Sequence, residues 1–464
     1  MQSILTKCIV FCALISGLMS CMSDPDFSSN PNKLLTFSAD TLRFDTLFAD
    51  VPSATRWLKV YNRNKEPLLI NDIRLSSETK EFRINVDGES GSVFQNIEIL
   101  GKDSIFIAVE TTLKPAASND PVIAQDAILF SFNGITQKIE LEALSWDAIK
   151  WDGMVVNKHL TLTSEKPYLI YDSLYVAPDA LLDIKAGTRI FFHKKARLIV
   201  DGSIHATGQQ GMPVVFRGDR LDDMLSGLPY DKVSGQWEGI SFSEKSYDNK
   251  FEYCDIHSSV NAIRIEGKST TSVQPQLIIK NSLIHNSLKT GLWAKNTSLS
   301  VSGSQITNSG ENLLDLNGGV YDFVNCTIAN LYSFGAVYGY AVNVSSEEKE
   351  LSLIMRNSIV WGKNRNEIYI PSSATNNITY KFENSLLKGK EEQTENYQNI
   401  IWNIDPRFKA KGTDHYFDFR LDSASVARGL GKQPISPAPD IDFYGVNRNV
   451  ENPDAGAFQY SGEK

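Results

Sequence analysis

The stretch that decides the fold runs from Leu277 to Asn330 and reads LIIKNSLIHNSLKTGLWAKNTSLSVSGSQITNSGENLLDLNGGVYDFVNCTIAN. One short motif occurs in it three times, as KNSLI, SGSQI and VNCTI, with the small central residues Ser282, Ser304 and Cys326 spaced 22 residues apart. A repeat of this length, built from short apolar runs without helical spacing, indicates one supersecondary unit that stacks on its neighbours. A step near 22 residues predicts one turn of a parallel β-helix.

The motif continues in both directions as EYCDI, RNSIV and ENSLL. Its small central residues, called the stack residues here, are Cys254, Ser282, Ser304, Cys326, Ser358 and Ser385, and they follow one another after 28, 22, 22, 32 and 27 residues. The longer steps predict loop insertions on an otherwise regular coil. Apolar residues stand two positions after each stack residue and three before it, so we expect them inside the coil: Ile256, Ile284, Ile306, Ile328, Val360 and Leu387, and Phe251, Ile279, Val301, Phe323, Met355 and Phe382.

The residue before the stack residue is usually asparagine. It is Asn281, Asn325, Asn357 and Asn384 in four motifs, Gly303 in one and Tyr253 in another. Asparagine and glycine tolerate the left-handed backbone conformation that a tight corner requires. Asparagine amides stacked on one another can also hydrogen-bond along the coil axis, so we expect an asparagine ladder to fix this corner.

Two further segments resemble parts of known β-helix proteins. The run LYVAPDALLDIKAGTRIFFHKKARLIVDGSIHATG, residues 174–208, resembles the entry rungs of bacterial right-handed β-helix proteins. Residues 405–464 resemble the closing segment of bacterial surface β-helix proteins, in positions Asp442, Gly445, Arg448, Asp454, Gly456 and Phe458. The resemblance implies a right-handed parallel β-helix over 147–404 and a capping segment over 405–464, which we expect to cover the last open rung.

Residues 36–146 carry a different pattern. Short alternating runs follow one another between turn signals, which favours an antiparallel β-sandwich. The runs LKVYNRNKEPLLINDIRL (58–75) and GKDSIFIAVE (101–110) resemble immunoglobulin-like modules of the abnormal-spindle and major-sperm-protein type. Such modules mostly bind or space other proteins. The predicted fold class is therefore all-β, with an N-terminal sandwich before the β-helix.

The N-terminus indicates export. Residues 1–20 combine Lys7 with an apolar run that is too short to span a bilayer, which is typical of a signal peptide. The sequence LMSC that ends at Cys21 resembles the lipobox of bacterial lipoproteins, which implies cleavage before Cys21 and its acylation. Residues 21–35 then form a flexible tether. Met22 after the acylated cysteine favours the outer membrane or cell surface of a Gram-negative bacterium, with the membrane reached through the lipid.

The number of cysteines, the net charge and the spacing of the histidines argue against a disulfide, a nucleic-acid partner and a metal site. Only Cys254 and Cys326 remain in the folded part. They could pair, but buried thiols in the stack are the favoured interpretation. The net charge is −9 and no basic stripe occurs, so nucleic acid is not an expected partner. The histidines lack metal-ligand spacing. His257 and His285 occupy equivalent motif positions, and we expect a solvated outward pair rather than a catalytic dyad with Asp255.

Two groups of residues are candidates for ligand binding. The insertion RGDRLDDMLSGLPYDKVSGQ, residues 217–236, places Asp222, Asp223 and Tyr230 on a long loop, where binding residues often lie. A carbohydrate or calcium contact is one interpretation and a solvated loop is the favoured one, because the acids lack calcium-loop spacing. The aromatic residues Trp293, Tyr332, Tyr338 and Trp361 are candidate sugar platforms, or they fill the cores of loops.

Five short Asp-Ser or Asp-Thr motifs resemble the O-glycosylation sequon of a group of Gram-negative bacteria. Their hydroxyl residues are Thr41, Thr46, Ser104, Ser173 and Ser423. The resemblance implies that the chain resides outside the cytoplasm and that these residues are candidate glycosylation sites.

Three functions remain open. The favoured hypothesis is a non-catalytic lipoprotein that acts as an extended scaffold for glycan or for a protein complex. A polysaccharide lyase or hydrolase of the β-helix type is the alternative. The expected signatures of such enzymes, acids around calcium with a basic residue or paired aspartates with histidine and arginine, were not found in the sequence, so no catalytic residue and no cofactor is assigned. The third is an adhesin or an accessory subunit of an outer-membrane import or assembly complex.

Overall fold

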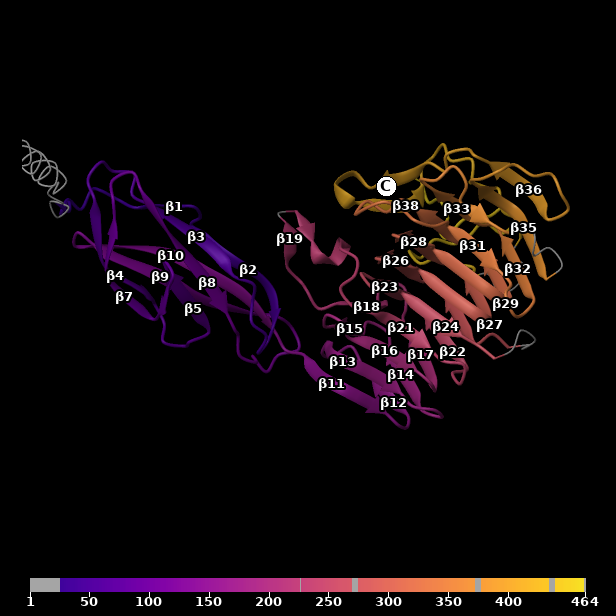
Figure 1. Cartoon of the computed structure of the whole chain (residues 1–464), viewed down its shortest axis with the longest axis horizontal. Coiled ribbons are helices and arrows are strands. Elements are labelled where there is room, and N and C mark those ends of the chain that lie inside the picture. Colours follow the sequence, from indigo (N-terminus) through magenta and orange to yellow (C-terminus); the bar gives the residue numbers. More distant parts are fainter. Residues whose placement is uncertain (1–25, 226, 269–273, 372–376, 434–438, 463–464) are drawn as a thin grey trace, which may run out of the picture. The chain divides into compact units, whose positions relative to one another are not determined.

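The computed structural model describes residues 26–225, 227–268, 274–371, 377–433 and 439–462, and Figure 1 shows the order of their elements. The signal segment and Cys21 lie outside these residues. The chain divides into two compact units, one made of the described residues up to Ala116 together with Pro121–Trp146, the other of Ala117–Asp120 together with the residues from Asp147 onward. Within the described residues no helix is both long enough and apolar enough to cross a membrane.

The first unit contains two five-stranded sheets. The first sheet has the order β1-β3-β8-β5-β6 and the second β2-β10-β9-β4-β7. Neighbouring strands are antiparallel, except that β2 runs parallel to β10. The bounds are β1 Thr36–Phe37, β2 Thr41–Phe48, β3 Arg56–Tyr61, β4 Leu68–Leu75, β5 Phe82–Val86, β6 Glu89–Gly91, β7 Val93–Ile99, β8 Ser104–Thr111, β9 Val122–Phe132 and β10 Ile135–Trp146. Alternate residues such as Leu58, Val60 and Ile107 face a closed apolar core.

The second unit is a parallel β-helix, which confirms the predicted all-β class. Its 24 strands form one continuous parallel ladder. The bounds are β11 Ile149–Val156, β12 Leu160–Leu162, β13 Tyr168–Val176, β14 Leu181–Lys185, β15 Arg189–Phe192, β16 Arg197–Val200, β17 Ser203–Thr207, β18 Val214–Gly218, β21 Gly239–Phe242, β22 Asn249–Glu252, β23 Cys254–His257, β24 Ile263–Glu266, β25 Leu277–Lys280, β26 Leu283–Ser287, β27 Leu292–Ser302, β28 Gln305–Ser309, β29 Leu314–Val324, β30 Thr327–Asn330, β31 Val342–Ser345, β32 Leu351–Arg356, β33 Ile359–Gly362, β34 Ile368–Tyr369, β35 Ile378–Leu387 and β36 Tyr397–Trp402.

Strands at the same place in successive rungs stack into rows, visible as parallel arrows in Figure 1. One row follows β16, β21, β24, β27, β29, β31 and β34, and another follows β15, β18, β23, β26, β28, β30 and β33. The predicted inward register is confirmed, because Ile256 pairs with Ile284 and Ile284 with Ile306. The same holds for the second predicted set, in which Val301 pairs with Phe323. These side chains lie in one apolar core that runs through the coil.

The stack residues lie above one another and are joined by hydrogen bonds. The hydroxyl of Ser304 accepts the backbone N–H of Ser282 at 3.0 Å and donates to the carbonyl of Ser302 at 2.8 Å. Ser282, Ser358 and Ser385 make the same pair of bonds to the rung before and to their own chain. A buried serine therefore accepts the N–H that a rung would otherwise leave unpaired at the bend.

Both cysteines are free, buried thiols of this stack. Cys254 donates weakly to the carbonyl of Ala206 and Cys326 to that of Val301. Burial raises the pKa of both thiols, that of Cys326 to about 12. They therefore stay protonated and unreactive.

The asparagine corner has the predicted backbone, but the predicted ladder occurs only at its last step. Asn281, Asn325, Asn357 and Asn384 have φ between 44° and 52°, and even Tyr253 adopts φ 48°. Asn399 of the next rung donates its amide to Asn384 at 2.9 Å, as expected for amides bonded along the axis. For the other three asparagines the expectation was wrong, because their amides donate to carbonyls of C-terminal residues: Asn281 to Ile441, Asn325 to Asp454 and Asn357 to Lys432.

The C-terminal residues explain this difference, because they lie along a side of the coil. They include β37 (Phe408–Lys411) and β38 (Phe417–Leu421), which pair antiparallel, and Figure 1 shows this yellow segment beside β33 and β35. Phe419 and Leu421 share an apolar cluster with the outward-facing Ile359 and Leu386 of the coil. Farther back, Phe443 contacts Tyr253. We expected a cover over the last rung, but outward apolar residues on many rungs require a cover along the side.

Candidate functional site

The row that contains β24, β27, β29, β31 and β34 presents a column of ligand-binding residue types. Because inward residues such as Ile263 and Ile265 are fully buried, the residue between them faces outward. The register joins these outward positions rung by rung. They are Arg264, Trp293, Asp315, Asn343 and Tyr369, called the Trp293 column here.

Contacts between neighbouring rungs order the Trp293 column. The guanidinium of Arg264 lies over the ring of Trp293, 4.2 Å from its centroid. The amide of Asn343 donates to Oδ1 of Asp315 at 2.8 Å. The ring of Tyr369, which is 44% exposed, stacks on Tyr340 with centroids 5.2 Å apart. These contacts hold aromatic and polar groups in place before any ligand arrives.

A second outward column runs beside the first. The register joins Glu266 to Lys295, Lys295 to Asn317 and Asn317 to Ser345. Lys295 also forms an ion pair with Glu348, 3.3 Å between Nζ and Oε1. Rungs repeat about every 4.8 Å, a distance on the scale of one sugar ring. The two columns together offer donors, acceptors and aromatic rings at a regular spacing along the coil.

The row of β18, β23 and β26 and the 217–236 insertion beside it carry a group of ionisable residues, called the His257 cluster here: Arg217, Asp255, His257 and His285 on the strands and Asp231 on the insertion. Nε2 of His285 lies 3.0 Å from Oδ1 of Asp255, and the two imidazole rings stack with centroids 4.8 Å apart. Arg217 pairs with Asp231 at 2.6 Å. The two histidines, which occupy equivalent motif positions, therefore stack on adjacent rungs.

The predicted solvation of this pair was wrong for His257, whose side chain is only 5% exposed. The 217–236 insertion covers it: Oδ1 of Asp231 lies 3.6 Å from its Nε2, and Ser258 donates to the carbonyl of Asp231. Burial lowers the pKa of His257 to about 4. Burial also acts against the charge of His285, but the hydrogen bond and charge of Asp255 outweigh it and raise the pKa of His285.

The chemistry open to the His257 cluster is proton transfer. Asp255 keeps a lowered pKa despite its burial, because His257, His285 and Arg217 surround it. His285 and Asp255 are each about one quarter exposed, so solvent reaches this pair. Across the described ranges no group of three His, Cys, Asp or Glu side chains is placed to hold a metal ion.

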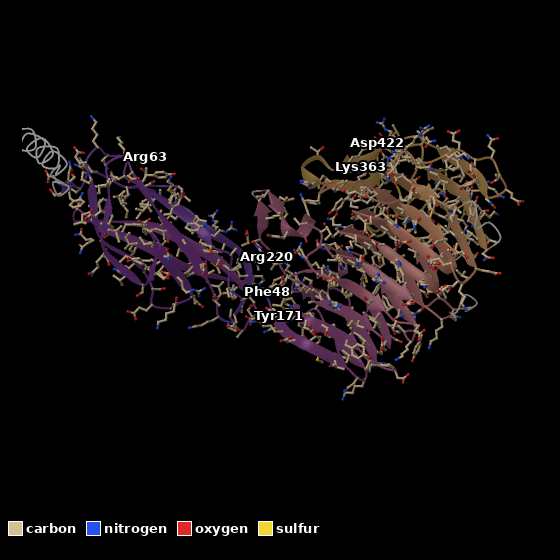
Figure 2. All side chains as sticks on the ribbon, viewed as in Figure 1. Phe48, Arg63, Tyr171, Arg220, Lys363 and Asp422 are labelled. Carbon is tan, nitrogen blue, oxygen red and sulfur yellow. The ribbon has the colours of Figure 1, made fainter. Side chains whose placement is uncertain are left out.

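The candidate residues of the insertion are held mostly by their own loop, which contains β19 (Asp223–Leu225), β20 (Leu228–Pro229) and the 3-10 turn η1 (Tyr230–Lys232). Arg220, labelled in Figure 2, donates to Asp222 at 2.7 Å and lies over the ring of Tyr230. Asp223 is exposed and accepts the N–H of Gly227. Because Asp222 is paired with arginine, its carboxylate is a poor calcium ligand.

The four candidate aromatic residues do not meet at one site. Trp293 lies half-buried in its column, and Tyr338 is 84% exposed on the loop that also holds Tyr340. Tyr332 is buried, with its hydroxyl 2.8 Å from that of Ser234. Trp361 packs against the apolar cluster under the C-terminal residues, with the ammonium of Lys388 over its ring.

The candidate glycosylation residues are spread over both units. Thr41, Thr46, Ser104 and Ser173 are half-buried and Ser423 is exposed. Their placement does not test the glycosylation hypothesis, which stays a prediction.

Sequence reasoning missed most of the Trp293 column. Trp293 follows its stack residue Ser282 by 11 positions, and Asp315 follows Ser304 by the same offset, so the repeat could have identified Asp315. Tyr369 follows Ser358 by 11 positions as well, so the repeat could also have identified Tyr369. Asn343 follows Cys326 by 17 positions, because a loop insertion changes the offset, and no signal in one sequence places it on the same row.

Comparisons with known proteins identify no family. No family model matches the chain, and no curated protein matches it. One solved structure that matches in part is a family 123 glycoside hydrolase from Clostridium perfringens, at 8% identity and TM-score 0.18, over 24% of this chain and 26% of that one. Another is a protein of unknown function from Porphyromonas gingivalis, at 8% identity and TM-score 0.19, over 28% of this chain and 60% of that one. These partial likenesses carry no functional argument.

Proposed function

We propose that this protein is a non-catalytic, lipid-anchored scaffold of the outer membrane or cell surface, and that its coil binds an extended glycan along the Trp293 column. The observation that carries the proposal is the alignment of Arg264, Trp293, Asp315, Asn343 and Tyr369 at one outward position of five successive rungs. Aromatic rings pack on the apolar faces of sugars, and planar polar groups bond to their hydroxyls.

The charges of the two columns favour an uncharged polymer. Arg264 is offset by Asp315 in the first column, and Lys295 by Glu266 in the second. A polyanion would require a uniformly basic face. The regular rung spacing suits an extended polymer better than a compact ligand, because each rung places one outward side chain at the same position along the coil.

Membrane attachment is part of the proposal and is supported by the sequence that ends at Cys21. Acyl chains on one cysteine would hold the chain stably at a bilayer, since each buried methylene contributes about 0.8 kcal/mol. Residues 22–27 would tether the folded units to it. Residues 28–35, expected as part of the tether, belong instead to the first unit, where the N–H of Ser28 donates to the carbonyl of Pro67 and Leu35 is buried in the core. Attachment would concentrate the binding face at the surface where polymers arrive.

The test compares binding of soluble neutral polysaccharides, namely xyloglucan, galactomannan and mixed-linkage glucan, by affinity electrophoresis and calorimetry. We expect Trp293→Ala to weaken binding at least tenfold, because the ring and its contact with Arg264 are both lost. The matched control is Tyr247→Ala, which removes an exposed aromatic ring outside the column. Equal binding by Trp293→Ala and the parent chain would contradict the proposal.

A polysaccharide lyase or hydrolase is the second candidate, and the Asp255–His285 pair beside Arg217 is the observation that favours it. The same incubations are assayed for new reducing ends and for absorbance from unsaturated ends. The scaffold proposal expects neither. Depolymerisation that Asp255→Asn abolishes would replace the scaffold with an enzyme.

A further inference from the structure

The first unit contains a cleft that the proposed function does not use. It has a volume of about 1060 Å³ and is lined from both sheets. The contributing strands are β3, β8, β5 and β6 of the first sheet and the adjoining ends of β4 and β7 of the second. We call it the Trp57 cleft.

A cross-strand row explains the hollow. The register places Trp57 opposite Ala108, Ala108 opposite Asn85 and Asn85 opposite Ser90. Trp57, Ala108 and Asn85 each stand next to a buried residue of their strand, so their side chains face outward. Ser90 is exposed, and its hydroxyl accepts from Asn85. Because Ala108 carries only a methyl group, it leaves a depression between the indole of Trp57 and the amide of Asn85.

One wall of the Trp57 cleft is aromatic and open to solvent. Trp57 is 63% exposed, although tryptophan is usually one of the more buried residue types. The ring of Phe106, 46% exposed, meets it edge to face at 6.4 Å. Large exposed rings at a cleft mark a binding surface, because their exposure costs hydrophobic free energy that a ligand would recover.

Other lining residues of the Trp57 cleft are polar and held in place by their own hydrogen bonds. Asn85 donates to Ser90 at 3.0 Å. Arg83 donates to Thr112 at 3.1 Å and lies 3.9 Å from Glu110, which accepts from Thr55 at 2.6 Å. These groups keep further donor and acceptor capacity, since an amide, a guanidinium and a carboxylate each form several hydrogen bonds.

The composition of the lining selects the class of ligand. Its charged residues are of both signs: Arg74, Lys80 and Arg83 against Glu78 and Glu110. A strongly charged ligand would therefore gain little electrostatic binding energy from this lining. The edge strand β6 has only three residues, Glu89–Gly91, which offers few backbone groups for an added peptide strand. Recognition must come from an aromatic ring and planar polar side chains, which together suit a pyranose ring.

We infer that the Trp57 cleft is a second carbohydrate site, which binds a short neutral oligosaccharide with one sugar on the Trp57 ring and its hydroxyls on Asn85, Arg83 and Glu110. The inference does not depend on the Trp293 column. The coil would bind along a polymer, whereas this cleft would hold a few units of a chain. A carbohydrate site on each unit would give the protein two independent contacts with one polymer.

The test titrates the full-length, detergent-solubilised protein with neutral hexasaccharides of glucose, mannose, galactose and xylose, one at a time, by calorimetry. We expect Trp57→Ala to weaken binding at least tenfold and Trp57→Phe to stay within about threefold, because phenylalanine keeps a ring. Asn85→Ala is expected to weaken binding about threefold to tenfold. Ile123→Ala is the matched control, since it removes an exposed apolar side chain from the other sheet.

The two carbohydrate proposals fail separately. Binding that Trp293→Ala abolishes and Trp57→Ala leaves unchanged would overturn the Trp57 site and support the column. Binding lost in Trp57→Ala and kept in Trp293→Ala would support the cleft. Absence of heat with all four hexasaccharides would overturn the inference, and polysaccharide binding through Trp293 would then stand alone.

Discussion

The two units place neighbouring side chains together by different means. In the coil, Trp293 and Asp315 are neighbours because they are one turn apart in the sequence and occupy the same position of successive rungs. In the sandwich, Trp57 and Ala108 are neighbours because strands far apart in the sequence pair antiparallel. A coil therefore repeats a contact along one direction, while a sandwich assembles a single compact cleft. This difference is why we propose a polymer for one unit and a short oligosaccharide for the other.

The same difference applies to stability. The coil gains its stability from interfaces between successive rungs, so each rung supports the next. The sandwich closes one core between two sheets. Three predictions test how far this contrast goes, beginning with the largest expected effect.

Phe323→Ala and Phe130→Ala should each destabilise their own unit by about 3–5 kcal/mol, because both rings are fully buried. Phe323 stacks between Val301 and Met355 of adjacent rungs, whereas Phe130 lies in the core of the sandwich. Hydrogen–deuterium exchange read by mass spectrometry should show faster exchange in the coil for the first variant and in the sandwich for the second. Faster exchange in both units after either substitution would contradict the view that the two units are stabilised separately.

Ser304→Ala should destabilise the coil by about 1–3 kcal/mol. The change removes the acceptor of the Ser282 N–H and leaves that buried donor unpaired. Urea unfolding measures the loss. The control is Ser300→Ala on the preceding strand, β27, whose side chain faces outward and is half-buried. Equal urea midpoints for the two variants would show that the serine stack does not contribute to the stability of the coil.

The smallest effect is a pH dependence confined to the coil. His257 has a pKa of about 4 when folded and near 6.5 when unfolded, so the unfolded chain takes up the proton first. Its contribution to stability is therefore lost as the pH falls from 6.5 to 4. The raised pKa of His285 acts oppositely: its stabilisation is present below pH 6.5 and lost as the pH rises through its folded pKa.

Single variants separate these opposing terms. Urea midpoints at pH 7.5, 6 and 4.5 should fall less on acidification for His257→Gln than for the parent chain, and more for His285→Gln. Identical pH profiles for both variants would show that neither imidazole has the proton affinity that its surroundings imply. The sandwich holds no histidine among its described residues and provides the internal reference.

The sequence predicted the coil far better than either candidate site. The spacing of Ser282, Ser304 and Cys326 was sufficient to predict the fold and the inward register. The repeat length gives the size of one rung, and equivalent positions of the repeat recur on every rung. The spacing could not predict that three of the asparagine amides bond to the C-terminal residues, since that contact joins positions 160 residues apart in the case of Asn281 and Ile441. The sequence did not identify Trp57 as a site residue. Its neighbours Ala108 and Asn85 come from other strands, and local sequence patterns do not reveal which strands pair.

The C-terminal segment has a consequence for how the chain becomes folded. Gln210 donates to the carbonyl of Tyr444, 234 residues later, so the side of an early rung is completed only by residues that are synthesised long after it. A stack of rungs alone has low contact order and frays from its ends, whereas long-range closure raises contact order and slows the final step. Synthesis would therefore deliver the rungs in sequence, and the coil would become one cooperative unit only when the C-terminal segment has docked.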